Sequence, residues 1–317
     1  MLPIHLVPPD TKIRFLEIRK AAFALSLLLV IASVGVFFAR GLNFGIDFQG
    51  GTLIEVRTDG PADLADMRAK LTRLPLGEVN LQEFGEPNEV LIRIQRQQGD
   101  EKQQIKAIKL VKETLGSDIE YRRTEFVGPK VGSELKTAGT WAVVLAMAGI
   151  LLYVWFRFEW QFGVGAVLAL AHDVISTIGI FAALQLEFNL STLAAILTIA
   201  GYSINDTVVV YDRVRENLRK YKREDLASLL NRSINDTLSR TVMTSLTTLL
   251  ALLALYIFGG AVIRGFSFAM IWGIVVGTYS SIFIAAPLLL YLNLPRAGRG
   301  GKTARKEEAK SAGAKAS

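Results

Sequence analysis

The chain has 317 residues, 51% of them hydrophobic, and a mean hydropathy of +0.35, which excludes an ordinary soluble globular protein and fits a multi-pass membrane protein. It contains no cysteine, so disulfides and thiolate chemistry are excluded, and its only histidines are His5 and His172, which argues against a histidine-based metal site. The net charge of +7 would suit a nucleic-acid-binding protein, but the placement of the cations explains it differently.

The first apolar run covers residues 21–39 and ends at Arg40. Residues 1–20 before it are polar and carry four cations. The run is longer than the apolar part of a signal peptide, and no small-x-small cleavage site follows it. We therefore predict an N-terminal segment, 1–20, followed by a first transmembrane helix, 21–39.

Residues 40–137 have frequent charges and periodic apolar residues, which predict a folded α+β domain outside the membrane. Strands are expected at 52–57, 78–84, 89–95 and 119–127, with a turn at Gly85 and Pro87. Helices are expected from the spacing of Leu64, Met67, Leu71 and Leu74 and from that of Ile105, Ile108, Val111 and Leu115, the second stopped by Gly116. The order β-α-β-β-α-β is that of a ferredoxin-like fold.

Residues 138–293 contain the remaining apolar runs, at 138–156, 162–184, 190–211, 241–258 and 265–292. Together with the first helix they predict six transmembrane helices. A long, basic and amphipathic connector is expected at 212–240. The tail, 294–317, is rich in Gly, Ala and Lys and is expected to be disordered.

The distribution of Lys and Arg predicts the orientation. With the N-terminus inside, the inner segments hold twenty cations and the short outer loops hold one, Arg264. Both termini are therefore expected in the cytoplasm and residues 40–137 in the periplasm. The charge is then a topology signal that also favours contact with anionic lipids, and no nucleic acid is expected.

Asp206 is the most informative residue, because it lies inside the fourth apolar run. It precedes Asp212 by six residues, so in a helix it sits roughly 9 Å inside the end of the span. A charged carboxylate at that depth is costly and usually functional. The alternative is that Asp206 is merely hydrogen-bonded to a neighbouring helix. Tyr202 lies four residues earlier and shares its face, and Asn205 is adjacent.

Arg240, Thr244 and Thr248 recur at four-residue spacing in the fifth run, with Thr247 beside them. We hypothesise that Asp206 exchanges a proton as the Arg240 guanidinium approaches and withdraws, with Thr244 holding water or relaying the proton. The alternatives are that Arg240 extends to the membrane interface and that the threonines bond to their own helix. The pentapeptide Ser-Ile-Asn-Asp-Thr also occurs at 233–237, where Asp236 lies in the polar connector and is assigned no role.

Two further groups lie inside predicted spans. His172 and Asp173 either form a neutral hydrogen-bonded pair or pass protons, and the sequence favours neither. Gly273, Gly277 and Ser281 form a small-xxx-small ridge suited to helix packing.

In combination, several motifs resemble the SecF family of bacterial SecDF protein-export subunits over roughly residues 12–293. They are the segments 45–52, 127–132, 171–173, 201–206, 239–241 and 244–245. The resemblance implies half of an RND-type transporter fold, completed by SecD, which assists polypeptides leaving the SecYEG channel by using the proton-motive force. It implies that Asp206, Arg240 and Thr244 serve proton transport, that a further essential aspartate lies on SecD, and that the chain is neither an enzyme nor cofactor-dependent, protons being the coupling ion.

Two other interpretations remain open. An intramembrane aspartyl hydrolase would use two carboxylates such as Asp173 and Asp206 in one hydrogen-bond network. A purely structural assembly subunit would use its buried polar groups only to fix packing.

Overall fold

The computed structural model describes residues 8, 11–95, 97, 101–116, 119–292 and 294. Within these residues, six helices are long and apolar enough to cross a membrane, which confirms the predicted fold class: Phe15–Arg40, Val131–Arg157, Trp160–Leu184, Leu190–Lys220, Leu226–Phe258 and Val262–Leu288. Apart from Leu294, the tail that was expected to be disordered lies outside the described residues.

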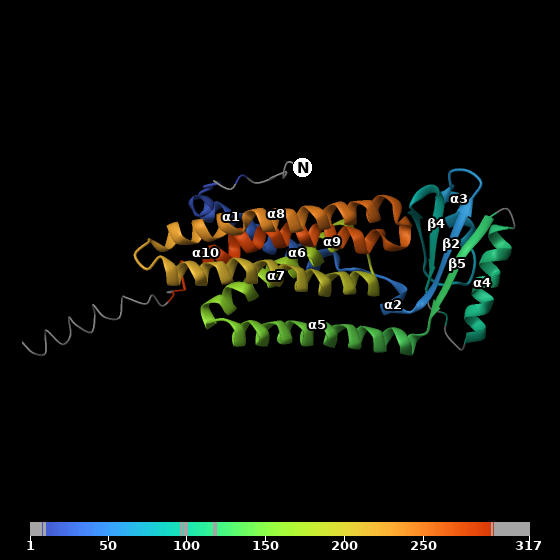
Figure 1. Cartoon of the computed structure of the whole chain (residues 1–317). Coiled ribbons are helices and arrows are strands. Elements are labelled where there is room, and N and C mark those ends of the chain that lie inside the picture. Colours follow the sequence, from blue (N-terminus) through green and yellow to red (C-terminus); the bar gives the residue numbers. More distant parts are fainter. Residues whose placement is uncertain are drawn as a thin grey trace, which may run out of the picture.

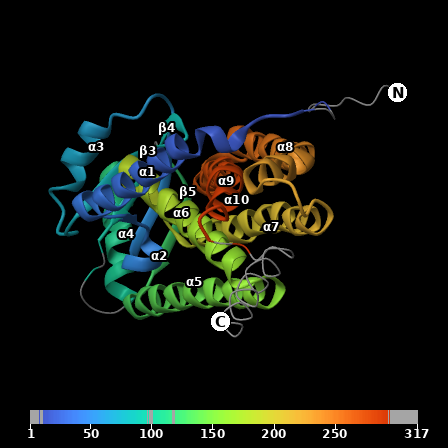
Figure 2. The ribbon, with the colours of Figure 1, turned by 90° about the vertical axis from the view of Figure 1, so that its left-hand side faces the viewer.

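The spans form one bundle with a small sheet domain at one end (Figure 1). They are α1 (Arg19–Arg40), α5 (Pro129–Arg157), α6 (Trp160–Leu184), α7 (Leu190–Lys220), α8 (Leu226–Phe258) and α9 (Gly260–Ser280), the last continuing through a π-helical turn (Ser281–Ala285) into α10 (Ala286–Leu288). Helix α9 lies at the centre and contacts α6, α7 and α8 (Figure 2). Its most apolar stretch is 61% buried, against 6% for α5, which lies on the outside.

An apolar core lies at the end of the bundle that is far from the sheet domain. Tyr211 of α7 is fully buried and packs edge-on against Phe162 of α6. Val214 of α7 and Leu230 of α8 belong to the same cluster. The Tyr211 hydroxyl donates to the carbonyl of Ala285, at the end of the π-helical turn, over 3.1 Å. Burying these side chains fixes how α6, α7 and α8 meet the last span.

The segment 212–240, predicted as a basic, amphipathic connector, is helical over most of its length. Helix α7 continues to Lys220 and α8 begins at Leu226, so only a short turn separates them. The apolar face of the expected amphipathic segment packs into the core, while its cations stay at the surface, and this pairing stabilises both helical extensions. The Asp225 side chain caps α8 by accepting from the amides of Ala227 and Ser228.

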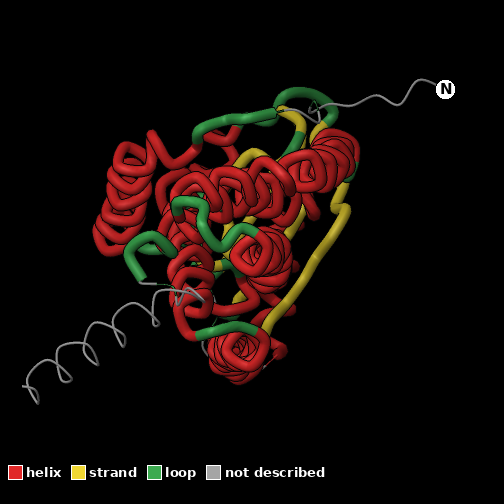
Figure 3. The backbone as a smooth tube through the Cα atoms, turned by 60° about the vertical axis from the view of Figure 1, so that its left-hand side comes forward, coloured by secondary structure: helices red, strands yellow, loops and turns green. Residues whose placement is uncertain are grey.

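The sheet domain has the predicted split β-α-β-β-α-β order. Its elements are β2 (Gly51–Thr58), α3 (Leu64–Leu71), β3 (Val79–Phe84), β4 (Glu86–Ile94), α4 (Glu101–Leu115) and β5 (Ile119–Val127). The strands pair in the order β3-β4-β2-β5, all antiparallel. Figure 3 shows the strands in yellow beside and behind the helices in red.

Strand β2 is buried on both faces over residues 51–56, although Thr52 and Glu55 in this stretch are polar. Ile54 and Val56 point to one face, where they pack against Met67 of α3 and Val111 of α4. Leu53 belongs to a smaller cluster on the opposite face. Alternation along a strand assigns Glu55 to the same face as Leu53.

Two predicted boundaries shift. Gly85 alone makes the β3–β4 turn, with φ of +90° in the left-handed region, and Pro87 lies within β4. Helix α5 starts at Pro129 directly after β5, so the domain boundary expected at residue 137 falls inside this helix. Proline suits a first helical position because its missing N–H would be unpaired there anyway.

The sheet domain is tied to the helices by backbone pairing. The strand β1 (Asn43–Phe44) follows α1 and pairs in parallel with β6 (Glu187–Phe188), which lies between α6 and α7. A short helix, α2 (Ile46–Gln49), connects β1 to β2 and packs against α5.

Candidate functional site

Helix α7 carries Asp206 toward the interior of the bundle. The helix starts at a cap in which the Asn189 side chain accepts from the Thr192 amide over 3.0 Å. Its buried residues recur at three- and four-residue spacing, and Ile199, Ser203 and Asp206 belong to that face. Asp206 is therefore directed at α8 and α9 rather than at lipid, with 7% of its surface exposed.

Two hydroxyls from two different helices hold the Asp206 carboxylate. Thr241 of α8 donates to Oδ1 over 2.7 Å. Ser281, the first residue of the π-helical turn, donates to Oδ2 over 2.8 Å. Each carboxylate oxygen thus has one neutral donor, which orients the group without neutralising a charge.

Arg240, the predicted partner of Asp206, lies beside this site but outside it. It precedes Thr241, and the step of 100° between neighbouring helical residues turns it to the exposed face of α8. Neither a hydrogen bond nor an ion pair joins the described Arg240 side chain to Asp206. Arg240 is thus the neighbour in the chain of Thr241, which binds the Asp206 carboxylate, but does not itself bind that carboxylate.

The predicted threonine stripe is also turned outward. The Thr244 hydroxyl donates to the carbonyls of Arg240 and Thr241, each over 3.0 Å. Thr247 and Thr248 likewise donate to carbonyls of their own helix. All three therefore show the back-bonding that was the alternative interpretation of this stripe.

Asp173 of α6 occupies a second, separate site with no exposed surface. Its Oδ1 is 3.0 Å from Nδ1 of His172, and its Oδ2 accepts from Ser203 of α7 over 2.5 Å and from Ser280 of α9 over 2.8 Å. The Nε2 atom of His172 is buried and has no partner among the described residues.

Two consecutive serines, Ser280 and Ser281, connect the Asp173 site to the Asp206 site. Ser280 donates to Asp173 and Ser281 to Asp206, and both also donate to the carbonyl of Gly277. The π-helical turn starts at the second of them. Such turns are often found at functional sites, and here a change in helical winding at residue 281 would move the hydroxyl that holds Asp206.

Tyr202 and Asn205 have different placements. Tyr202 is half-buried, and its hydroxyl is 3.5 Å from Ser245 Oγ, which is 2.7 Å from Thr278 of α9. Tyr202 and Asp206 thus both face α8. Asn205 is exposed and takes no part in either carboxylate site.

The glycines of the predicted ridge lie against α7. A methyl group at Gly273 would collide with Ile199, and one at Gly277 would come within 3.2 Å of Ser203 Cβ. These positions let α9 approach α7 closely. The third member of the ridge, Ser281, has the additional contact to Asp206.

Comparison with known proteins gives two family matches. Residues 106–294 match the family described as "Protein export membrane protein SecD/SecF, C-terminal", and residues 35–62 match the "SecD/SecF GG Motif". The protein translocase subunit SecF of Rickettsia bellii is 48% identical over 90% of this chain and 95% of its own length. That of Cereibacter sphaeroides is 46% identical over 93% of this chain and 94% of its own.

The chain belongs to the SecF family. Its relatives are named as translocase subunits and not as enzymes, and the six spans make this SecF-family chain a multi-pass membrane protein.

Solved SecDF structures share the fold of this SecF-family chain. The crystal structure of SecDF from Thermus thermophilus, titled a translocon-associated membrane protein, superposes with a TM-score of 0.82 at 41% identity, covering 91% of this chain and 39% of that one. A SecDF structure in the super-membrane-facing form gives 0.67 at 39% identity, over 98% of this chain and 41% of that one. The chain thus spans about two fifths of the SecDF chains.

Sequence reasoning missed the hydroxyls that bind the carboxylates of this SecF-family chain. The prediction from sequence names Arg240 and not its neighbour Thr241, and it includes neither Ser203 nor Ser280. Ser281 was assigned to packing alone. A usable signal existed for Ser203, which lies three residues before Asp206 and therefore near the same face of α7.

The geometry permits one kind of chemistry at Asp206. A buried carboxyl between neutral donors can hold a proton, and a guanidinium that enters the site can displace that proton by stabilising the charged form. Arg240 keeps its charge throughout, because arginine does not deprotonate in proteins.

Proposed function

We propose that this chain uses the proton-motive force to assist protein export, with Asp206 as the group that takes up and releases the proton. SecF-family membership makes the chain an accessory subunit of Sec protein translocation. The observation that supports proton coupling is the Asp206 carboxylate, 7% exposed, which accepts from Thr241 and Ser281 and has no ion pair with a cation among the described residues.

The proposed cycle has two states. In the state described here, Arg240 is outside the site and a proton on Asp206 removes the cost of a buried charge. In the second state the guanidinium reaches Asp206, which releases its proton. A proton that crosses the membrane potential supplies about 2.3 kcal/mol per 100 mV, enough to bias two conformations of a bundle.

A partner helix would complete the site. Thr198, Gly201 and Asn205 of α7 and Arg240 and Thr244 of α8 are exposed, although they lie in membrane-spanning helices. Small and polar side chains at this depth favour contact with another protein over contact with lipid. We propose SecD as that partner, in keeping with the SecDF structures to which this chain is similar.

The remaining assignments follow from this proposal. The complex would sit in the bacterial cytoplasmic membrane beside SecYEG and act on exported preprotein chains. Both termini would be cytoplasmic, which puts the basic ends of α7 and α8 against anionic lipids, and the sheet domain would be periplasmic. Protons would be the coupling ion, no cofactor would take part, and the chain would not be an enzyme.

An aspartyl hydrolase is less well supported. Its two acids must share one hydrogen-bond network to activate water. Here, within the described residues, Asp173 and Asp206 accept from different donors, connect only indirectly through the Gly277 carbonyl, and have no hydrogen bond between them and no common donor at which one water could be activated. Asp173 also has no exposed surface at which a peptide could bind.

The test is gradient-dependent preprotein translocation in inside-out membrane vesicles that contain the complex. Asp206→Asn should abolish the stimulation by a proton gradient, because an amide cannot exchange a proton. Asp236→Asn, in the second copy of the same pentapeptide, is the matched control and should retain it. Undiminished stimulation in Asp206→Asn vesicles would refute the proposal, and it is also the result that a purely structural subunit predicts.

A further inference from the structure

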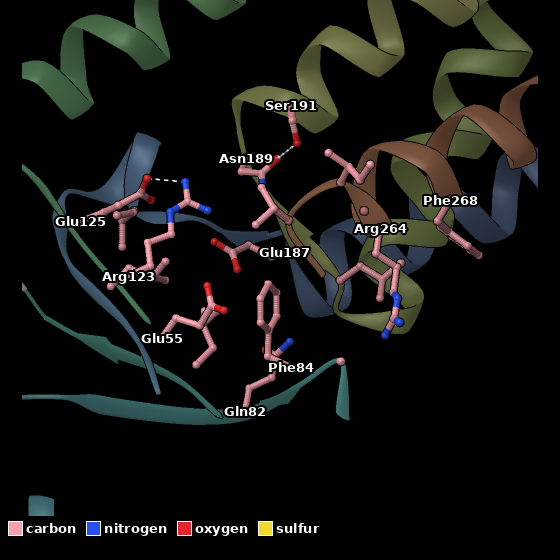
Figure 4. A pocket seen from close by; sticks show the side chains of 18 of the residues that line it. Glu55, Gln82, Phe84, Arg123, Glu125, Glu187, Asn189, Ser191, Arg264 and Phe268 are labelled. Atoms are coloured by element: carbon pink, nitrogen blue, oxygen red, sulfur yellow. Dashed lines mark hydrogen bonds and ion pairs between the residues drawn. The ribbon is translucent and has the colours of Figure 1, made fainter. Parts of the chain in front are cut away.

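A cavity of about 440 Å³ lies where the sheet domain meets the ends of α6, α7, α8 and α9 (Figure 4). Its size falls within the range of ligand-binding pockets. Residues from both parts line it, so its shape depends on how the sheet domain is attached to the helices.

The attachment uses an ion pair and a helix cap. Arg93 of β4 forms an ion pair of 3.0 Å with Glu187 of β6, and it also donates to Asn43 and to the Phe44 carbonyl. The Asp47 side chain accepts from the first amide of α7, that of Leu190, over 2.9 Å. These contacts hold the two walls of the cavity in place.

Two carboxylates point into the cavity from opposite walls. Glu55 comes from the sheet face that does not carry α3 and α4, and Glu187 comes from strand β6, just before α7 (Figure 4). Glu187 is largely buried, and this burial raises the pKa of Glu187 above its ordinary value in spite of the opposing effect of Arg93. The two carboxyl groups thus lie at a place where a negative charge is poorly solvated and a nearby cation would favour the charged form.

Glu55 lacks a good partner within the described residues. It is 8% exposed, and its one ion pair, with Arg122, is 3.9 Å long, beyond hydrogen-bond distance. Arg122 instead bonds Glu89 over 2.6 Å. A buried carboxylate with no close donor is unfavourable, so a cationic group in the cavity would be strongly stabilised there.

The rest of the lining suits the stem of a long basic side chain. Phe84, Leu91 and Phe268 supply apolar and aromatic surface, which favours the methylene groups and the flat guanidinium of arginine. Arg123, which lines the cavity, forms an ion pair with Glu125. Acidic lining residues outnumber the arginines, Arg123 and Arg264, so an anionic ligand is disfavoured.

We propose that this cavity binds a basic side chain, arginine or lysine, of an extended polypeptide segment. The charged head lies between Glu55 and Glu187, and the stem lies against Phe84. The identification of that polypeptide with an exported chain rests on the proposed function. The site would give the sheet domain a direct contact with its substrate next to the first turn of α7, the helix that carries Asp206.

The test measures peptide binding to the purified complex in lipid nanodiscs, without a proton gradient. The probe is a fluorescent hexapeptide, Ala-Gly-Arg-Phe-Ala-Gly with blocked ends, and the matched peptide has neutral citrulline in place of arginine. We expect the citrulline peptide to bind at least about tenfold more weakly, the effect of losing charge-assisted hydrogen bonds. Glu55→Gln should weaken binding of the arginine peptide by a similar factor, and Glu113→Gln on the exposed face of α4 should not.

Equal binding of the two peptides, or full binding by a folded Glu55→Gln complex, would overturn the proposal. If Glu55→Gln does not fold, the two peptides on the unaltered complex decide the question. Binding that appears only in Arg123→Gln would mean that the chain's own arginine fills the cavity, which also overturns it. Because this assay uses no gradient, and the vesicle experiment uses no peptide probe, the failure of either proposal can be recognised separately.

Discussion

The same five residues, Ser-Ile-Asn-Asp-Thr, occur at Ser203–Thr207 in α7 and at Ser233–Thr237 in α8, and the two copies have different surroundings. Asp206 in the first copy accepts from two neutral hydroxyls and, within the described part of the chain, from no charged group. Asp236 in the second forms an ion pair of 2.8 Å with Arg213 and accepts from Asn217. Both copies are helical, so local sequence sets the same conformation twice, while position relative to the membrane and neighbouring helices decides the chemistry.

The largest predicted difference concerns the donors to the two carboxylates. Removing both hydroxyls at Asp206, in Thr241→Val with Ser281→Ala, should lower gradient-dependent translocation by roughly tenfold or more, because each hydrogen bond to a charged group contributes about 1.5–3 kcal/mol. Arg213→Gln, which removes the partner of Asp236, should change it by about twofold at most, since exposed ion pairs contribute about 1 kcal/mol or less. If the double variant and Arg213→Gln lowered gradient-dependent translocation equally, the two copies of the pentapeptide would not differ in function.

A smaller difference is predicted for the serines. Ser203→Ala deprives the fully buried Asp173 of a donor and should lower the free energy of unfolding by about 1–3 kcal/mol. Ser233 donates to the Leu229 carbonyl and accepts from Asn217, so Ser233→Ala should cost about 1 kcal/mol. Thermal unfolding of the complex in detergent checks this order. A larger loss for Ser233→Ala would show that the Asp173 site contributes little to stability.

The smallest difference is predicted for the asparagines. Asn235 bonds both the amide and the carbonyl of Ile13 and so holds the segment before α1. Asn235→Ala should speed hydrogen exchange at the Ile13 amide by about tenfold or less, the loss of one hydrogen bond. Asn205→Ala should leave exchange at the Ile13 amide unchanged, because its exposed side chain lies on α7 and does not contact that segment. Faster exchange at this amide in Asn205→Ala, or unchanged exchange in Asn235→Ala, would contradict the placement of the two asparagines.

The sequence predicted the six spans and the sheet domain because both depend on periodic apolar residues. It also identified Asp206, since a carboxylate inside an apolar run is conspicuous. It could not identify Thr241 in place of Arg240, because the two differ only by a rotation of 100° about one helix axis, which packing decides. It missed the role of Ser281 because small residues in a ridge predict packing first.

The sequence indicated that the connector at 212–240 is basic and amphipathic, but not that it extends two transmembrane helices. Its apolar residues, among them Val214 and Leu230, form helical faces that the core of the bundle buries. Asp236, which lies in this segment, is therefore part of a helix and is paired with Arg213. That Asp236 takes no part in proton coupling remains a prediction.

The protonation of Asp206 can be measured directly by infrared difference spectroscopy of the complex in lipid during a pH jump. The account predicts a carbonyl band of a protonated carboxyl that appears and disappears with pH, is lost in Asp206→Asn and persists in Asp236→Asn. A band that survives in Asp206→Asn, or one that disappears in Asp236→Asn, would contradict the assignment of the exchangeable proton to Asp206.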